Sequence, residues 1–123
     1  MNMKEFKEKR KFLRLASKLP VRFLYRGSFH GAVIDNIGLG GMEFITKSPL
    51  LINSDVQFIL DLPFNEEIKR CVLLGKIIRA SDEVSGIWFK LVCSFRYSSA
   101  ISLKILGTFL KSAIRTSIKK KRF

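Results

Sequence analysis

The stretch "PVRFLYRGSFHGAVIDNI", residues 20–37, contains two alternating apolar runs on either side of a glycine. In the first run Val21, Phe23 and Tyr25 share one face of a strand, because side chains two positions apart point the same way. Gly27-Ser28 between the runs is typical of a tight hairpin. The stretch therefore predicts two antiparallel strands, residues 20–26 and 29–37.

The same pattern continues through the central part of the chain. Further strand-like runs occupy residues 42–47, 55–62, 69–81 and 86–95, separated by turn residues. Six short strands at a spacing of about 8–12 residues are typical of a small antiparallel barrel or sandwich. We therefore expect a mostly β fold. Two cysteines, Cys71 and Cys93, fall in these runs without a CxxC or Cys/His cluster, so we expect small core residues.

Residues 98–119 have a different periodicity. Apolar residues recur there at spacings of three and four, while lysines and an arginine fall on the opposite side, which predicts an amphipathic helix. Ser98 or Ser99 is a candidate N-cap. The apolar face, which we expect to pack on the barrel or on a second copy of the chain in a homodimer, consists of Ile101, Ile105, Leu106, Phe109, Leu110, Ala113, Ile114 and Ile118.

The net charge of +13 is concentrated at the two ends of the 123-residue chain. Residues 1–26 carry nine Lys/Arg and two Glu, residues 27–95 carry six Lys/Arg and eight Asp/Glu, and residues 96–123 carry eight Lys/Arg and no acid. This distribution favours two basic flanks over one continuous basic groove. No run approaches the ~18 apolar residues that a membrane-spanning helix needs, and no signal-type segment follows the basic N-terminus. We therefore expect a cytoplasmic protein.

Catalytic chemistry finds little support in the residue pattern. The only histidine, His30, lies in a predicted strand without a nearby triad or metal-like arrangement, and is best interpreted as a plain strand residue. The paired acids Glu66-Glu67 and Asp82-Glu83 fall in predicted turns. We expect a non-enzymatic protein that holds no metal and no cofactor.

A glycine-rich turn joins the second and third predicted strands. "DNIGLGGM", residues 35–42, has glycine at positions 38, 40 and 41. Such a turn exposes backbone N–H groups and lets an anion or a planar ring approach the main chain. A bulged connection without a ligand explains the stretch equally well. It does not match GxGxxG and no helix follows it, so a dinucleotide-binding βαβ unit is disfavoured.

Two arginines precede the first predicted strand in "RKFLR", residues 10–14, and "NIGLGG", residues 36–41, follows the second. Together they resemble the PilZ family of bacterial cyclic di-GMP receptors, whose motifs are RxxxR and, further along, D/NxSxxG. The resemblance extends from about residue 8 to about residue 110, and "GIWF", residues 86–89, resembles the family's late strand. It implies a six-stranded antiparallel β-barrel with a C-terminal helix.

The resemblance also implies which residues bind cyclic di-GMP. The motif positions are Arg10 and Arg14, with Asn36, Gly38 and Gly41 in the second motif. We place the second motif on Asn36 because that register keeps a small residue at the third place. Secondary candidates are Lys9, Asp35, Gly40 and Arg79.

The residue types suit this ligand, because the planar guanidinium of arginine can bond bidentately to a phosphate or to a guanine edge and can stack on a purine. An asparagine amide can both donate to and accept from a guanine edge. The sequence departs from the family at Gly38, where the family has serine. One lost hydrogen bond is worth ~0.5–1.5 kcal/mol, so we expect weaker binding.

The predicted organisation has three parts: a basic arm at residues 1–19, the barrel at residues 20–97, and a basic helix with tail at residues 98–123. Ligand binding is expected to order the arm against the barrel and so alter the surface shown to a downstream protein effector. Two other hypotheses stay open. The chain could be a basic adaptor for nucleic acid or an anionic membrane, or a PilZ-like interaction module without ligand binding.

Overall fold

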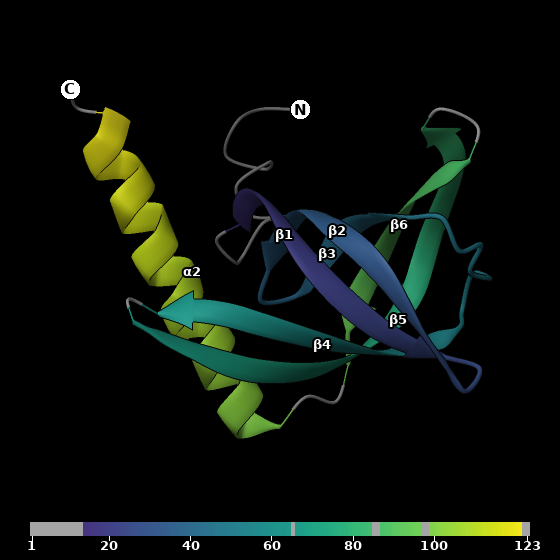
Figure 1. Ribbon diagram of the computed structural model, residues 1–123, viewed down its shortest axis with the longest axis horizontal. Helices are drawn as coiled ribbons and strands as arrows, with labels where there is room; N and C mark the ends of the chain where they lie inside the picture. Colours follow the sequence, from purple (N-terminus) through teal and green to yellow (C-terminus); the bar gives the residue numbers. More distant parts are fainter. Residues whose placement is uncertain (1–13, 65, 85–86, 97–98, 122–123) are drawn as a thin grey trace, which may run out of the picture.

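The computed structural model describes residues 14–64, 66–84, 87–96 and 99–121. For residues 14–17, 81–84 and 114–121 it describes the backbone alone. Six antiparallel strands close into a barrel in the order β1-β2-β3-β6-β5-β4 (Figure 1). This confirms the predicted six-stranded antiparallel barrel. The strands are β1 (Arg14–Tyr25), β2 (Ser28–Gly38), β3 (Gly41–Thr46), β4 (Asp55–Phe64), β5 (Glu67–Val84) and β6 (Trp88–Phe95).

The turn between β1 and β2 lies one residue earlier than predicted. Tyr25 and Ser28 are register partners, so the two-residue loop is Arg26-Gly27 and not Gly27-Ser28. Both loop residues have positive φ, 51° at Arg26 and 78° at Gly27. A turn with two positive φ angles matches the right-handed twist of the strands that it joins, and this explains the position of Gly27.

β1 is longer than the first predicted strand. It begins at Arg14, six residues before the predicted start at Pro20, so residues 14–19 belong to the barrel wall and not to an N-terminal arm. Pro20 lies outside the stretch of β1 that pairs with β4, which is Arg22–Leu24. A proline is tolerated where a strand lacks a partner on one side. Residues 14–19 thus form a strand that the sequence did not predict, because they are basic and alternate only weakly.

Aromatic rings fill the centre of the barrel. Phe23, Phe44 and Phe58 are fully buried, and their ring centres lie 5.2–6.0 Å apart in tilted arrangements. Edge-to-face pairs of this kind are more favourable than stacked sandwiches. Cys71 and Cys93 are buried and free, which confirms their prediction as core residues.

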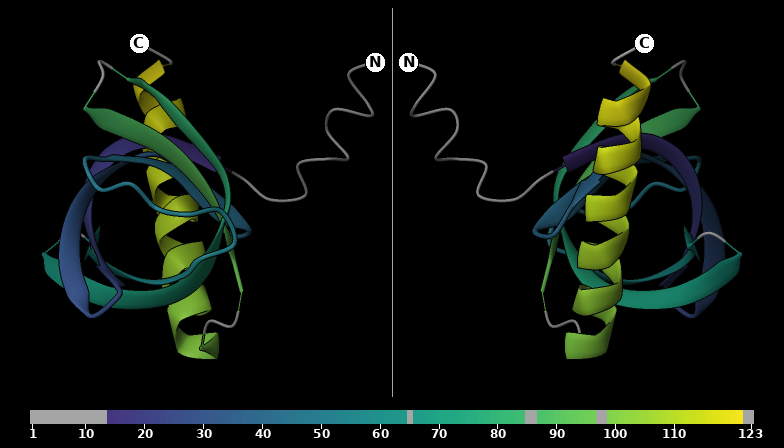
Figure 2. Two further views of the ribbon diagram at one scale, coloured as in Figure 1. Left: turned by 90° about the vertical axis from the view of Figure 1, so that its right-hand side faces the viewer. Right: turned by 90° about the vertical axis from the view of Figure 1, so that its left-hand side faces the viewer.

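The C-terminal helix α2 (Ala100–Lys121) begins where the cap was predicted. The Ser102 N–H donates to Ser99 Oγ at 3.1 Å, so Ser99 is the N-cap. The helix lies along one side of the barrel (Figure 2) and buries Leu106, Phe109 and Leu110. Ile101, which was predicted on the same apolar face, is 74% exposed, whereas the next residue, Ser102, is buried and hydrogen-bonded to β5, so the buried face of α2 does not include Ile101.

Several contacts attach α2 to the barrel. On β5, Cys71 Sγ donates to the Ser102 carbonyl and the Val72 N–H donates to Ser102 Oγ, each at 3.3 Å. Phe109 meets Phe64 of β4 edge-on, with 6.1 Å between ring centres. A Cβ added at Gly107 would lie 3.8 Å from Leu39, in the turn between β2 and β3. Gly107 of the helix therefore lies next to Leu39 of the glycine-rich turn, with space for a methyl group between them.

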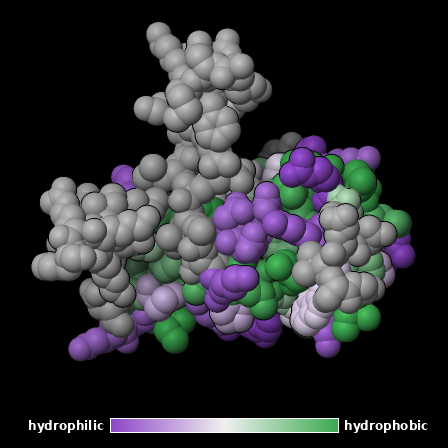
Figure 3. All heavy atoms as spheres, turned by 90° about the horizontal axis from the view of Figure 1, so that it is seen from above, coloured by the Kyte–Doolittle hydropathy of each residue, from purple (hydrophilic) through white to green (hydrophobic). Residues whose placement is uncertain are grey.

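The surface of the barrel is mixed in character. Hydrophilic and hydrophobic residues are interspersed over the face seen in Figure 3. Among the described residues, no helix is both long enough and apolar enough to cross a membrane.

Candidate functional site

The two sequence motifs meet in the ladder between β1 and β2. Arg14 is the register partner of Gly38, and Ala16 is the partner of Asn36. The backbone of the second arginine position therefore lies beside the glycine-rich turn, at the end of the barrel where β2 passes into β3. Lys9 and Arg10 lie outside the described residues.

A bulge in β2 turns two polar side chains to the outside. The β2–β3 register shifts between Ile34 and Asn36, so Asp35 is the additional residue. Ile34 and Ile37 are fully buried, whereas Asp35 and Asn36 are half-buried. A regular strand would turn one of these two polar residues inward. The bulge thus explains why both candidates face outward.

A second bulge, in β5, brings Arg79 to the same face. The β5–β6 register shifts between Ile77 and Arg79, with Ile77 fully buried and Ile78 and Arg79 exposed. One row of register partners crosses four strands, from Asn36 through Glu43 and Val92 to Arg79. At about 4.8 Å between neighbouring strands, Asn36 and Arg79 lie roughly 14 Å apart along this row.

Lys90 of β6 links two acids on this face, and the sequence analysis missed it. Its Nζ lies 3.3 Å from Asp35 Oδ2 and 3.4 Å from Glu43 Oε2. Lys18 Nζ lies 3.9 Å from Asp35 Oδ1. The hydrogen bond to Asp35, followed by the one to Glu43, raises the pKa of Lys90. Strand alternation in residues 42–47 and 86–95 is the signal that places Glu43 and Lys90 outside.

A hollow of about 300 Å³ lies on the row, lined by Glu43, Arg79, Ala80, Lys90 and Val92. Two cations and one acid line it, and the acid is already paired with Lys90. The guanidinium of Arg79 is exposed. This hollow with its flanking Asp35 and Asn36 is called the outer face below. Its cations Arg79 and Lys90 balance its acids Glu43 and Asp35, and the exposed Arg79 suits an anionic group of a ligand.

Gly40 and Gly41 have structural roles in the turn. The Gly40 carbonyl accepts a hydrogen bond from the Phe95 N–H at 2.9 Å. Gly41 is buried, and a Cβ there would collide with the carbonyl oxygen of Cys93. Close packing of β3 on β6 therefore requires glycine at position 41, without any need for positive φ. Gly38 is also buried. Ligand contact at these glycines stays a prediction.

Among the described residues, no three His, Cys, Asp or Glu side chains come together as a metal site would require. For the two buried thiols, burial outweighs the hydrogen bonds with Ser102 and the Met42 backbone. Burial raises the pKa of Cys71 to about 11 and that of Cys93 to about 12. A thiol with such a raised pKa is a poor nucleophile at neutral pH.

Residues 8–112 match the model of the PilZ domain. No curated protein matches the chain. Several solved structures share the fold. The inhibitor of motility MotI/DgrA from Bacillus subtilis is 17% identical, with a TM-score of 0.76 over 90% of this chain and 52% of that chain.

Two other structures contain the nucleotide in their own complexes. The PilZ domain of YcgR from Escherichia coli, solved with c-di-GMP, is 15% identical, with a TM-score of 0.67 over 93% of this chain and 98% of that chain. The K. pneumonia MrkH–c-di-GMP complex is 16% identical, with a TM-score of 0.70 over 90% of this chain and 55% of that chain. The chain thus spans about half of MotI and MrkH and nearly all of the YcgR domain.

Proposed function

Because the chain belongs to the PilZ domain family, we propose that it is a non-enzymatic receptor for cyclic di-GMP. The observation that carries the proposal is the register pairing of Arg14 with Gly38, which joins the two motifs at one end of the outer face. The c-di-GMP complexes of YcgR and MrkH support the same ligand class.

In this proposal Arg10 and Arg14 bind the phosphates and a guanine edge, and Lys9 is a further phosphate contact. Asn36 reads a guanine edge through its amide, and Asp35 accepts from guanine N–H groups. Arg79 meets the ligand from β5, on the outer face that it shares with Asn36. Planar guanidinium groups at both ends of the face suit a ligand with two phosphates and two purines.

Ligand binding would have to rearrange ion pairs that are present in the structure. In the structure Asp35 and Glu43 are both paired with Lys90. An incoming phosphate would compete for Lys90 and release Asp35 to a guanine. Since these side chains are partly exposed, their pairing in water is weak, and the exchange costs little. Lys90 is therefore proposed as a ligand contact that the motifs do not include.

Gly38 weakens binding in this proposal without abolishing it. The family's serine hydroxyl is missing, which costs about twofold to tenfold in affinity. Gly38→Ser is expected to restore that factor. If the wild-type chain bound cyclic di-GMP more than about tenfold more weakly than Gly38→Ser, this would instead favour an interaction module that does not bind the nucleotide.

The output is proposed to pass through the turn to the helix. Ligand binding fixes the residues before β1 against the barrel, and Leu39 of the turn lies next to Gly107 of α2. A downstream protein effector would read the altered surface formed by the N-terminal residues and α2. The partner can also be a second copy of this chain, which would form a homodimer through the exposed Ile101.

Calorimetric titration with cyclic di-GMP tests the proposal. We expect wild-type binding, loss of binding for Arg10→Ala combined with Arg14→Ala, and at least a tenfold loss for Arg79→Ala, about 1.4 kcal/mol. Arg70→Ala is the matched control, because Arg70 lies on the same strand but pairs with Asp61 away from the outer face. The absence of binding at about 100 μM, or normal binding by the double arginine variant, would exclude the proposed site.

A further inference from the structure

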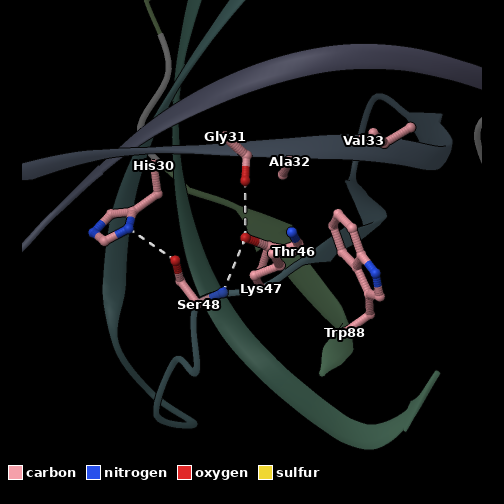
Figure 4. A pocket seen from close by; sticks show the side chains of 8 residues that line it. All are labelled: His30, Gly31, Ala32, Val33, Thr46, Lys47, Ser48 and Trp88. Carbon is pink, nitrogen blue, oxygen red and sulfur yellow. Dashed lines mark hydrogen bonds between the residues drawn. The ribbon is translucent and has the colours of Figure 1, made fainter. Parts of the chain in front are cut away.

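An opening in the barrel wall lies between β2 and β3, at the end opposite the glycine-rich turn. The ladder between these strands ends at the pair Val33 and Ile45. Beyond it, side chains bridge the strands: Thr46 Oγ1 donates to the Gly31 carbonyl at 2.9 Å, and Ser48 Oγ is hydrogen-bonded to His30 Nδ1 at 2.8 Å. A hollow of about 400 Å³ lies at this opening (Figure 4).

The floor of the hollow is open because of Gly31. A Cβ built on Gly31 would meet no atom within 4 Å, so no packing accounts for glycine at this position. Thr46 is fully buried beneath, with its hydroxyl satisfied by the Gly31 carbonyl and the Ser48 N–H. The polar floor is thus rigid, and the space above it is unfilled by side chains of the described residues.

The two ends of the hollow offer different chemistry. Trp88 stands at one end, across from His30 and Ser48 at the other (Figure 4). Lys47 Nζ lies 4.9 Å from the centre of the Trp88 ring. No Asp or Glu is among the eight lining residues. A flat aromatic surface therefore adjoins one exposed cation and a hydroxyl, with no acid to neutralise the cation.

We propose that this hollow, called the tryptophan pocket, binds a small molecule with one planar aromatic ring and one anionic group, of the size of a nucleoside monophosphate. The ring stacks on Trp88, since stacking on an indole tolerates any base. Lys47 moves from the ring to the anion, because an exposed cation–π contact is weak and a lysine stem rotates freely. Ser48 donates to the same anion when His30 Nδ1 carries the proton of the hydrogen bond between them.

The tryptophan pocket is separate from the outer face. The two sites come nearest on β6, where Trp88 of one and Lys90 of the other are two residues apart, roughly 7 Å along a strand. The tryptophan pocket shares no lining residue with the hollow at Arg79. Binding at one can therefore be abolished without removing a contact at the other.

Titration with 5′-GMP tests this proposal, with quenching of Trp88 fluorescence as the first readout, since Trp88 is the only tryptophan. We expect saturable quenching, no comparable effect from guanosine or inorganic phosphate alone, and about fivefold weaker binding for Lys47→Gln. Calorimetry on Trp88→Ala should show a loss of about tenfold or more. Lys111→Gln, on an exposed position of α2, is the matched control.

Three outcomes would overturn the proposal. One is the absence of saturable binding by the folded protein at about 10 mM 5′-GMP. Another is unchanged affinity in both Lys47→Gln and Trp88→Ala, each shown to be folded by thermal melting. The third is loss of 5′-GMP binding in Arg79→Ala but not in Lys47→Gln, which would assign the nucleotide to the outer face. Failure of cyclic di-GMP to bind leaves all three tests intact.

Discussion

Arg14 and Gly38 face each other as register partners across the β1–β2 ladder. The RxxxR motif thus enters the barrel at its second arginine. Only the part of the motif before Arg14 precedes the strand, so the predicted moving arm shortens from residues 1–19 to residues 1–13. In the proposed mechanism Arg10 approaches a face whose position is already fixed by β1 and β2.

Gly41→Ala is expected to destabilise the barrel by about 1–3 kcal/mol, because its Cβ would collide with the Cys93 carbonyl. Denaturant unfolding measures the loss. Gly31→Ala is the control: its Cβ meets open space, so we expect a change within about 0.5 kcal/mol. Equal stability of the two variants would contradict the role assigned to Gly41.

Gly107→Ala should leave stability unchanged or raise it by up to about 1 kcal/mol. The added methyl would lie in ordinary contact with Leu39, and alanine favours the helix more than glycine does. Thermal melting checks this. A clear loss of stability would show that α2 packs closer to the β2–β3 turn than the structure indicates.

Thr46→Val should cost about 1–3 kcal/mol. The substitution keeps the shape of a fully buried side chain but leaves the Gly31 carbonyl and the Ser48 N–H without their partner. Thr46→Ser retains the hydroxyl and should be the milder change in urea unfolding. The opposite order would mean that the methyl group, and not the hydroxyl, stabilises this part of the wall.

Ser99→Ala should destabilise the protein by about 1 kcal/mol, since it removes the cap that accepts from the Ser102 N–H. Thr108→Ala, at an exposed position inside α2, is the comparison and should change stability by less than about 0.5 kcal/mol. Helix content and melting temperature together report the effect. An unchanged melting temperature for Ser99→Ala would argue against this cap.

Both cysteines should resist alkylation in the folded protein at neutral pH and react after denaturation, as mass spectrometry can show. Burial raises the pKa of the thiols to about 11 for Cys71 and about 12 for Cys93, from 9.0. Their contribution to stability is therefore constant below pH 9 and is lost as the pH rises towards 11, because the unfolded thiols ionise first. Fast labelling of the native protein would contradict this burial.

Much of the fold could be predicted because it follows from local patterns. Alternation identified six strands, and the spacing of three and four identified α2 with a cap at Ser98 or Ser99, of which Ser99 is the one in the structure. The errors lie where the local signal is weak. The β1 extension from Arg14 has too few alternating apolar residues, and Ile101 has the helical spacing but lies outside the buried face of α2, which contains its neighbour Ser102.

The outer face was predicted only in part. Asp35, Asn36 and Arg79 were candidates, and the structure places them on one face. Glu43 and Lys90 were missed, because Lys90 comes from β6, which is distant in sequence from the strands that carry its partners Asp35 and Glu43. The sequence also did not predict the bulges at Asp35 and Ile78, because a bulge is defined by the register between one strand and its neighbour.

The sequence by itself determined the β-barrel class, the helix, and the two motifs that resemble the PilZ family, since these follow from side-chain periodicity and residue chemistry within short segments. Only the tertiary structure decided that Arg14 pairs with Gly38, that Lys90 joins Asp35 to Glu43, and that Gly41 is required by the Cys93 carbonyl. The physical reason is that strand register and close backbone contacts arise from closure of the whole barrel, which no local stretch of residues specifies.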